Sequence, residues 1–446
     1  MKKHENLEKL DVSEALKRRF KNEVIKISFM GILAVAVVVA FIIVSTSIFF
    51  GGRAPKVLAE DLMHGIKPQK VETVELKDEF TNGAANFSVD LFKQAYKKGE
   101  NSLVSPTSVY LALGITANGS DGNTLKEFEN LLGKNNLNIQ KLNTYYNSLS
   151  KKLTKVNSGK LSIANSIWFR QNLDVKKDFL QINANYFNAS VYEADFNNAN
   201  TVKDINNWVK LNTSNTIDKI ITEIDKNTIM YLINAVAFED KWEKNYNKSD
   251  VLKDYFQLED GTKQTVNFMH SEENWYVKAD KVTGFIKPYK NGKYSFLALL
   301  PNNNISIDNY IASLSGEDIT WLLKNKTKDT VKVALPEFKV EDQINLKPAL
   351  EKMGLKDCFI EGKANFANMA NNSEGIYLRD ILHKTYVSVD HEGTKAGAST
   401  KVEMAQKSIS TAHSIILNRP FIYAIIDNET NLPLFIGTMM KPAIEK

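Results

Sequence analysis

The sequence predicts an α+β fold that is preceded by one N-terminal transmembrane helix. Residues 27–50 form an apolar run without a charged residue, which is long enough to cross a membrane as a helix. After this run, stretches with helical spacing and stretches with strand alternation follow each other in irregular order, without a repeat period. With 446 residues, of which 43% are hydrophobic and 24% charged, the chain can bury one large core or two smaller ones.

The composition excludes several classes of protein. The net charge of +5 is small for this length and the lysines are spread among acids, so no nucleic-acid partner is expected. The single cysteine, Cys358, leaves no disulfide framework and no cysteine-based zinc site, and its apolar neighbours predict a buried structural thiol. The sequence has no Gly-x-Ser-x-Gly, no His-Glu-x-x-His and no phosphate-binding loop, so we expect no catalytic residue, no metal site and no cofactor.

The N-terminal part predicts a membrane anchor. Residues 1–26 are polar and lysine-rich, and basic residues stay on the cytoplasmic side of a membrane, so we expect a cytoplasmic N-terminus followed by a signal-anchor helix at 27–50. A cleaved signal peptide is the alternative, but its apolar region is usually shorter and ends in a small-residue cleavage site. The rest of the chain is then extracellular, on a single-pass protein of the cell membrane. Residues 51–76 predict an extracellular tether, and the globular domain is expected from 77 to 446.

Periodicity and turn residues predict the elements of the globular domain in order. Helices are expected where apolar residues recur at helical spacing, and Pro106 marks the start of one of them. Strands are expected where apolar and polar residues alternate, or where a short run is continuously apolar. The predicted helices cover residues 80–95, 106–116, 124–132, 139–156, 177–187, 201–213 and 346–353. The predicted strands cover residues 160–169, 190–196, 228–238, 296–300, 331–339 and 386–389. Residues 102–108 are expected to hold a short strand, a turn and a helix start, and residues 268–301 are strand-rich.

The segment after the strand that ends at Val389 has an unusual composition. For about 25 residues it shows no helical period and almost no large apolar side chain, so we expect an exposed, mobile loop. From Gly393 to Thr400 its residues are small or β-capable, and no proline occurs before Pro420, so this half of the loop can become a strand. The other half is polar and contains Lys407–Ser408, and exposed stretches of this kind are where proteases cut. An ordinary flexible surface loop is the alternative.

Several segments resemble motifs of the serpin family. HEGTKAGAST at His391–Thr400 resembles the hinge of an inhibitory serpin's reactive-centre loop, and LNRPF at Leu417–Phe421 resembles the family's Phe-Asn-Arg-Pro-Phe signature. PLFIGTMMKP at Pro433–Pro442 resembles the closing strand, and NSLVSPTSVYLALGITANG and NAVAFEDKW match two further motifs. The resemblance covers residues 78–443 and implies a serpin domain with its reactive-centre loop at 391–416. It implies a large central mixed sheet, called sheet A, with two smaller sheets and about nine helices.

The resemblance also assigns candidate site residues. The shutter, under the centre of sheet A, would comprise Ser105, Ser108, Asn234 and His383. The breach, where the loop first enters the sheet, would comprise Trp242 and Glu337. The hinge would comprise His391, Glu392, Gly393, Thr394, Ala396, Gly397, Ala398 and Ser399. A buried asparagine must satisfy its amide, so we expect a hydrogen bond between Asn234 and His383. The two serines can also cap helices, and the histidine can instead be exposed before a strand.

One pair of positions departs from the family pattern. Inhibitory serpins usually carry a glutamate at the hinge position occupied here by His391, and a lysine at the strand position occupied here by Glu337. Because the polarity is exchanged, we expect a His391–Glu337 pair that is modest in energy and stronger at low pH.

The resemblance raises the question of a second ligand. In some serpins the helix that matches residues 139–156 binds sulfated polysaccharide, and here it carries Lys141, Lys151, Lys152 and Lys155. A solvated helix face is the commoner explanation of such a charge run.

The resemblance implies a suicide-substrate inhibitor of serine proteases rather than an enzyme. The protease would attack the carbonyl of Lys407, and the cut loop would insert into sheet A from Gly393 onward and trap the acyl-enzyme. The expected partners are an extracellular serine protease and, through the N-terminal helix, the membrane, with the protein itself a monomer.

The position of the reactive bond and the class of target carry alternatives. Spacing from the hinge places the bond at Lys407–Ser408, whereas counting back from Leu417 places it near Ile409. A lysine before the bond implies trypsin-like targets, and Met404 would instead suit chymotrypsin-like or elastase-like enzymes. An inhibitor of subtilisin-like or cysteine proteases is a further alternative. A non-inhibitory serpin that acts as a surface binding or structural protein belongs to a different functional class.

Overall fold

The described part of the chain begins beyond the expected membrane anchor. The computed structural model describes residues 55–134, 137–154, 160–225, 227–290, 292–394 and 413–442. From Val57 onward, the described residues form one compact unit. The expected cytoplasmic segment 1–26 and transmembrane helix 27–50 lie outside the described residues. Within the described ranges, no helix combines the length and the apolar character needed to cross a membrane.

A seven-stranded mixed sheet forms the centre of this unit, as the resemblance implied, and we keep the name sheet A for it. From edge to edge its strands are β1 (Glu60–Asp61), β4 (Ser190–Ala194), β3 (Lys160–Arg170), β5 (Met230–Lys241), β13 (Gly393–Thr394), β12 (Asp380–Val389) and β11 (Phe338–Asn345). β5 is antiparallel to β3 and parallel to β12, and β12 is antiparallel to β11. The two-residue β13 lies between β5 and β12 and is antiparallel to both.

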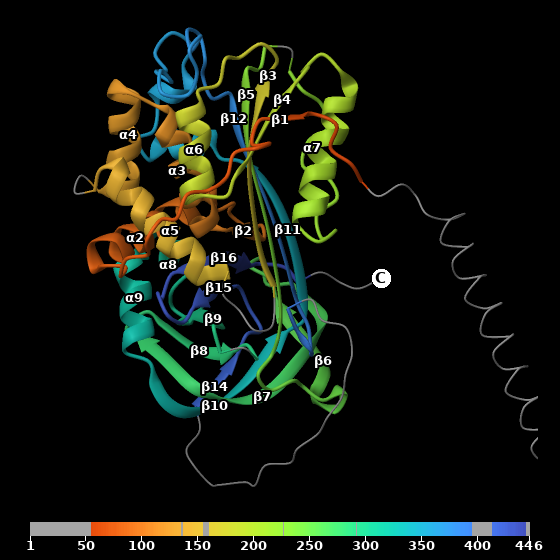
Figure 1. Cartoon of the computed structure of the whole chain (residues 1–446). Helices are drawn as coiled ribbons and strands as arrows, with labels where there is room; N and C mark the ends of the chain where they lie inside the picture. Colours follow the sequence, from red (N-terminus) through yellow and green to blue (C-terminus); the bar gives the residue numbers. More distant parts are fainter. Residues whose placement is uncertain are drawn as a thin grey trace, which may run out of the picture. The chain divides into compact units, whose positions relative to one another are not determined.

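β5 is buried on both faces because helices cover sheet A on both sides. Its residues from Met230 to Phe238 are all buried, as a continuously apolar strand requires. Val236 and Phe238 belong to the main hydrophobic core, whereas Ile233 and Ala235 pack in a separate cluster with side chains of α7 (Ala199–Asn212). Figure 1 shows α7 on one side of the sheet, and α3 (Pro106–Gly119) and α6 (Lys177–Tyr186) on the other.

The remaining strands form a second, nine-stranded network. Its order is β14 (His413–Ile416), β10 (Thr327–Pro336), β7 (Lys263–Ala279), β8 (Val282–Pro288), β9 (Tyr294–Pro301), β15 (Phe421–Asp427), β16 (Pro433–Met439) and β2 (Ser102–Val104), with β6 (Val251–Gln257) paired to β7. The 17-residue β7 pairs with β6 and β10 over most of its length and with β8 at its end. The two smaller sheets implied by the resemblance are therefore joined through this long strand.

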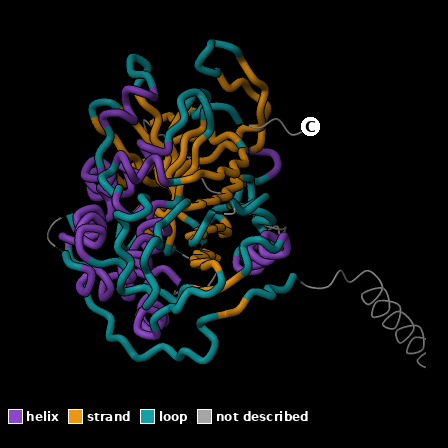
Figure 2. Tube along the Cα trace, turned by 90° about the horizontal axis from the view of Figure 1, so that it is seen from above, coloured by secondary structure: helices purple, strands orange, loops and turns teal. Residues whose placement is uncertain are grey.

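The described residues contain nine α-helices, most of which lie on one side of the strands (Figure 2). Besides α3, α6 and α7, they are α2 (Asp78–Ala95), α4 (Gly122–Gly133), α5 (Ile139–Thr154), α8 (Ile307–Ser313), α9 (Gly316–Lys324) and α10 (Lys347–Lys352). α3 begins with Pro106 at its first turn and is buried along almost all of its length. The helices expected from periodicity are present, with ends that differ by a few residues. The short helices α8 and α9 and the strands β1, β6, β14 and β15 were not among the elements predicted from sequence.

The single strand expected at 331–339 is two strands in two different sheets. β10 ends at Pro336 and belongs to the nine-stranded network, whereas β11 begins at Phe338 and belongs to sheet A. Proline has no amide hydrogen to continue a ladder, so the first strand ends there. Glu337 donates its backbone amide to the carbonyl of Asn267 in β7 and thereby lies at the crossing between the sheets. The alternation of apolar and polar residues continues through this crossing, so the sequence pattern did not reveal the change of sheet.

The segment expected as a tether is packed against the compact unit from Val57 onward. β1 adds Glu60–Asp61 to the edge of sheet A beside β4, and four side chains farther along the segment pack against the main core. These are Leu62, Met63, Ile66 and Leu76. The backbone amide of Val74 donates to Ser148 Oγ of α5 at 2.8 Å, and Gln181 Nε2 of α6 donates to the carbonyl of Lys67 at 2.9 Å. Figure 1 shows this segment passing over α5 and α6 toward α2. Its few apolar residues form no regular period, so composition predicted a linker.

Candidate functional site

A tight turn connects β12 to β13 and places the start of the candidate loop in sheet A. Asp390 Oδ1 accepts hydrogen bonds from the amides of Glu392 at 2.8 Å and Gly393 at 3.2 Å. The amide of Asp390 in turn donates to the carbonyl of Gly393 at 2.9 Å. An aspartate that accepts from backbone amides two and three residues ahead stabilises such a turn. We call residues 390–394, together with the residues that contact them, the hinge site.

β13 separates β5 and β12 at one end of these strands. Thr394 is opposite Asp240 of β5 and Val389 of β12. Beyond it, β5 and β12 pair directly, from Tyr386 opposite Ala237 to the other end of β12. The loop has thus begun to form a strand between two parallel strands. Each of these strands can form backbone hydrogen bonds with an antiparallel strand between them.

Gly393 is required at its position by close packing. A Cβ atom on this residue would lie 2.2 Å from the carbonyl oxygen of Asp240 and 2.7 Å from Cα of Lys241. Both contacts are with backbone, which cannot move aside as a flexible side chain does, so a larger residue here would push β13 out of register.

Two aromatic residues, one directly after β5 and one directly after β8, hold the turn. Trp242 donates its backbone amide to the carbonyl of Glu392 at 3.1 Å and its indole Nε1 to the carbonyl of Asp390 at 2.9 Å. The indole stacks on Tyr289, with ring centroids 4.6 Å apart. The hydroxyl of Tyr289 lies 2.7 Å from Thr394 Oγ1, whose side chain is fully buried. Trp242, the breach residue implied by the resemblance, therefore contacts the start of the loop directly.

His391 and Glu337 form the expected contact. His391 Nδ1 lies 3.4 Å from Glu337 Oε1, and the two side chains are 34% and 23% exposed. Asn267 Nδ2 donates to the other carboxylate oxygen at 3.0 Å and orients it. A partly exposed ion pair of this kind contributes about 0.2–1 kcal/mol when the histidine is protonated.

A second cluster links β5, β12 and α3 under the centre of sheet A. His383 Nδ1 and Asn234 Oδ1 are 2.5 Å apart, and this confirms the hydrogen bond expected from sequence. Asn234 Nδ2 donates to Ser108 Oγ at 2.5 Å and to Asn165 Oδ1 of β3 at 2.5 Å. The amide of the buried Asn234 is therefore fully satisfied, as burial requires.

The neighbours of His383 define its protonation. Its Nε2 accepts a hydrogen bond from the backbone amide of Ser105 at 3.0 Å, so Nδ1 carries the hydrogen that is donated to Asn234. Burial lowers the pKa of His383 to about 3, because the cationic form would lose its hydration. The histidine is fully buried within β12, so the alternative of an exposed residue before a strand is wrong.

The two serines that the resemblance assigned to the shutter do more than begin a helix. Ser105 is the N-cap residue of α3, but its side chain makes no capping hydrogen bond and donates instead to the carbonyl of Leu434 at 2.6 Å. Ser108, in the first turn of α3, accepts from Asn234. The cluster thereby ties α3 to sheet A and, through Leu434, to β16 of the second network.

Two carboxyl groups of the hinge site have raised pKa values. Burial raises the pKa of Asp240 to about 6, and its Oδ2 has no hydrogen-bond partner among the described residues. Burial also raises the pKa of Asp390, against the opposite effect of the amides of Glu392 and Gly393. Carboxylates that are costly to ionise therefore lie beside the point where the loop enters the sheet.

Part of the predicted site lies outside the described residues. This applies to the hinge residues Ala396, Gly397, Ala398 and Ser399 and to the reactive bond Lys407–Ser408. Sequence reasoning missed three polar members of the site, namely Asn165, Tyr289 and Asp240. Asn165 and Asp240 lie in β3 and β5, and Tyr289 directly follows β8. Their sequence patterns show only that neighbouring residues are buried, and a polar residue among buried positions was the available signal.

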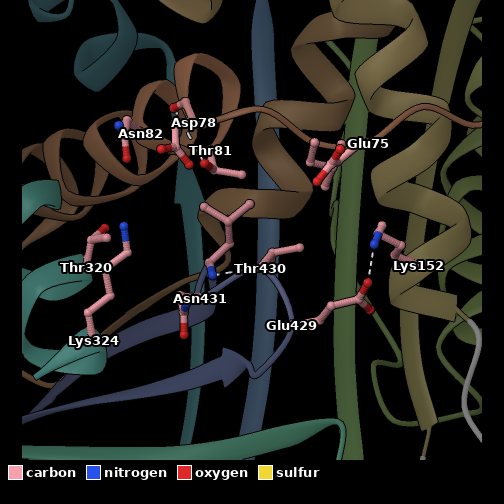
Figure 3. Close-up of a pocket in the computed structure, with 12 residues that line it drawn as sticks. Glu75, Asp78, Thr81, Asn82, Lys152, Thr320, Lys324, Glu429, Thr430 and Asn431 are labelled. Atoms are coloured by element: carbon pink, nitrogen blue, oxygen red, sulfur yellow. Dashed lines mark hydrogen bonds and ion pairs between the residues drawn. The ribbon is translucent and has the colours of Figure 1, made fainter. Parts of the chain in front are cut away.

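A polar cavity of about 260 Å³ lies away from these residues, between the start of α2, α5, α9 and the turn after β15 (Figure 3). Lys152 and Glu429 point toward each other across it and form an ion pair. Lys151 Nζ donates to the carbonyl of Val71 at 3.0 Å. Two lysines of the helix considered for sulfated polysaccharide are thus engaged within the chain. Among the described residues, no group of histidine, cysteine, aspartate and glutamate side chains is arranged to hold a metal ion.

Sequence comparison relates the chain to known proteins over most of its length. The family model described as Serpin (serine protease inhibitor) matches residues 82–442. Human Serpin B3 is 31% identical over 382 residues, which cover 80% of this chain and 97% of that protein. Human Neuroserpin is 27% identical over 373 residues, which cover 80% of this chain and 90% of that protein.

Comparison of structures gives the same result. The thermophilic serpin tengpin in its native state superposes with a TM-score of 0.83 at 46% identity, and covers 86% of this chain and 100% of that chain. Tengpin in its latent state gives a TM-score of 0.74 at 45% identity, with 83% of this chain and 100% of that chain covered. The chain is thus more similar to the native than to the latent structure of this relative.

Proposed function

The chain belongs to the serpin family, whose members are protease inhibitors rather than enzymes, and on this premise we propose that it is a suicide-substrate inhibitor of extracellular trypsin-like serine proteases. The observation that carries the proposal is the position of β13, an antiparallel wedge between the parallel strands β5 and β12. Inhibition by this mechanism requires that β13 extend further between β5 and β12.

The register of β13 defines how far an extended strand would reach along β5. Thr394 lies opposite Asp240, and each further residue of the loop would lie opposite the preceding residue of β5. On this register Met404 would lie opposite Met230, where β5 begins. The residues from 395 to 404 would therefore fill the length of β5.

The register along β12 gives nearly the same end point. Thr394 lies opposite Val389, so Glu403 would lie opposite Asp380, where β12 begins. Lys407 would then lie just past the far end of sheet A. A protease bound at Lys407 would be carried along the whole sheet, which supports this residue over Met404 as the position of the acyl bond.

The alternation of side chains along the loop suits such a strand. Successive residues of a strand face opposite sides, and Thr394 faces the main core beside Asp240. The residues that would share this face are Ala396, Ala398, Thr400, Val402 and Met404. The residues that would face the side on which α7 lies are Lys395, Gly397, Ser399, Lys401 and Glu403. The core face would thus receive small or apolar side chains, and the charged ones would point the other way.

The chemistry of trapping uses the protease's own catalytic groups. Its serine oxygen attacks the carbonyl carbon of Lys407, the bond to Ser408 breaks, and the amine of Ser408 leaves with the proton supplied by the protease histidine. Lys407 remains as an ester on the serine. The freed strand then gains a full ladder with β5 and β12, and this gain moves and distorts the protease before water hydrolyses the ester.

We also propose that residues 27–50 anchor the protein in the cell membrane, with residues 1–26 in the cytoplasm and the serpin domain outside. The charge-free apolar run and the preceding basic segment support this orientation. Protease treatment of intact cells that express the full chain should remove the serpin domain and leave residues 1–26 protected. Protection of both parts, or recovery of the protein without membrane, would contradict the anchor.

The inhibitory function is tested by incubating the full-length protein with trypsin and analysing the products by denaturing gel and intact mass. We expect a covalent complex and a released fragment that begins at Ser408, and Lys407→Ala should abolish both. A fragment that begins at Ala405, with a complex formed by chymotrypsin or elastase, would move the acyl bond to Met404. Cleavage that yields no complex and no gain in heat resistance would instead identify a non-inhibitory serpin.

A further inference from the structure

A buried lysine lies directly behind the residues that hold the hinge turn. The side chain of Lys287, in β8, is 2% exposed, and its Nζ lies 2.7 Å from Oε1 of Glu273, which is 6% exposed. The same carboxylate oxygen accepts a hydrogen bond from Ser271 Oγ at 2.6 Å. Burial lowers the pKa of Lys287, whereas the neighbouring carboxylate of Glu273 opposes this effect.

The ammonium group of Lys287 contacts the segment 242–246 at three points. It lies 4.4 Å from the ring centroid of Tyr246 and 5.3 Å from that of Trp242, within the range of cation–π interactions. It also donates to the carbonyl of Lys244 at 3.2 Å. One buried cation thus fixes both aromatic ends of the segment and the backbone between them.

The segment 242–246 provides the donors that hold the hinge turn. Its donors are the backbone amides of Trp242 and Tyr246 and the indole nitrogen of Trp242. Their acceptors are the carbonyl oxygens of three successive residues, at 3.1 Å for Glu392, 3.0 Å for His391 and 2.9 Å for Asp390. The conformation of this segment therefore determines where the hinge turn lies.

Stability alone does not explain a buried ion pair at this place. Removing two charges from water costs about as much as their attraction returns, and apolar residues of similar volume are often as stable or more so. A cation held between two rings and a carboxylate differs from an apolar side chain in that its contacts are directional. Directional contacts suit a group that positions its neighbours.

We propose that Lys287 and Glu273 are positioning residues for inhibition. The pair holds the segment 242–246 in the conformation that keeps the hinge turn in place and β13 in register between β5 and β12. This inference rests on the proposed inhibitory function for its consequence. Without the pair, the cut loop begins insertion later, and more acyl-enzyme is hydrolysed before it is trapped.

The test compares variants of the full-length protein that remove the cation. Lys287→Met leaves the carboxylate of Glu273 buried without its partner, and Lys287→Met/Glu273→Gln removes both charges and should regain most of the lost thermal stability. In both variants we expect at least twice as many inhibitor molecules cleaved per covalent complex as in the wild type. We also expect faster hydrogen exchange at the amides of Trp242 and Tyr246, measured without protease.

Lys293→Met provides a matched control. Lys293 is also largely buried, with 14% of its side chain exposed, and its Nζ lies 2.8 Å from the buried Asp427 at the end of β15. This variant should lose thermal stability, while the cleaved-to-trapped ratio and the exchange of the two amides stay as in the wild type.

The two readouts separate this inference from the proposed function. Wild-type exchange at Trp242 and Tyr246 in the double variant overturns the positioning role, whatever the protease assays give. Faster exchange with an unchanged cleaved-to-trapped ratio overturns its consequence for inhibition. Absence of a covalent complex with the wild type overturns the proposed function, while the exchange readout still tests whether the pair fixes the segment.

Discussion

Asn234 of β5 and His383 of β12 lie opposite each other in the parallel ladder and are joined by a side-chain hydrogen bond of 2.5 Å. This bond joins β5 and β12 directly, at a position that β13 would have to occupy if it extended further between them. Insertion of a strand must therefore break it, and the same two side chains tie the sheet to Ser105 and Ser108 of the α3 region. The bond contributes to the stability of the present state and, on the proposed mechanism, to the barrier against insertion.

Replacement of His383 should change the pH dependence of stability. Its pKa is about 3 in the folded protein and about 6.5 in an unfolded chain, so between these values the unfolded state binds the additional proton. The stabilisation that the neutral, buried ring of His383 provides is therefore fully present above pH 6.5. As the pH falls toward 3, the free energy of unfolding decreases by up to about 1.4 kcal/mol per pH unit. His383→Gln should lower the free energy of unfolding by about 2 kcal/mol at pH 7.5, because hydrogen-bonding groups around the buried ring are left without their partner. It should also remove the acid slope of the free energy of unfolding against pH.

Urea titrations at pH 7.5, 6, 5 and 4 measure the effect of His383→Gln. The matched control is His270→Gln, at an exposed position of β7, which should leave the slope unchanged. An equal acid slope in wild type and His383→Gln would show that protonation of the buried ring does not contribute.

Asp240→Asn should stabilise the protein at neutral pH. The carboxyl group has a pKa of about 6 when folded against an ordinary value of 3.8, so the folded state binds the additional proton between these values. The stabilisation that the protonated carboxyl group of Asp240 provides is therefore fully present below pH 3.8 and is lost as the pH rises through 6. Asparagine avoids the ionised, buried form, and we expect a gain of about 2 kcal/mol at pH 7.5 that disappears near pH 4.

The pH series of urea titrations also tests this substitution, with Asp280→Asn at an exposed turn as its control. A loss of stability in Asp240→Asn at pH 7.5, or a gain that persists undiminished at pH 4, would contradict a raised pKa at this carboxyl.

Glu337→Gln should have an effect only at acid pH. Low pH favours the cationic form of a histidine, so the attraction between His391 and Glu337 should be stronger at pH 5.5 than at pH 8. We expect a thermal midpoint lower by about 1–3 °C and a two- to fivefold slower inhibition at pH 5.5, and no change at pH 8. The control is Glu341→Gln in β11, which removes a carboxylate that lies 2.7 Å from Lys384 Nζ.

The pair of Glu341 with Lys384 involves no histidine, so Glu341→Gln should have the same effect at pH 5.5 and pH 8. If Glu337→Gln leaves the rate of inhibition and the thermal midpoint unchanged at both pH values, the pair with His391 has no role.

The packing of residues 57–76 predicts a stability effect from a segment that resembles a linker. Ile66 is partly buried against the main core, so Ile66→Ser should lower the free energy of unfolding by about 1 kcal/mol. Leu58, in the same segment, is 70% exposed, and Leu58→Ser should stay within about 0.5 kcal/mol of the wild type. Thermal unfolding compares the two variants, and equal midpoints would mean that the segment does not dock in solution.

Local sequence patterns were sufficient to predict several elements of the fold. The buried strand β5 and the helix α3 follow from continuous apolar runs, and the hydrogen bond between Asn234 and His383 follows from the rule that buried amides are satisfied. Pattern failed at Glu337, where one alternating run crosses between two sheets, because alternation reports which face is buried but not which neighbour pairs with it.

The sequence by itself determined the family, the order of the main elements, the apolar run at residues 27–50 and a loop whose side chains suit a strand, because these properties depend on composition and spacing along the chain. Only the tertiary structure decided that β13 has entered between β5 and β12, that residues 57–76 are docked, and that Lys287 lies behind Trp242 and Tyr246. These features join residues that are far apart in the sequence, and such contacts depend on packing in three dimensions rather than on local periodicity.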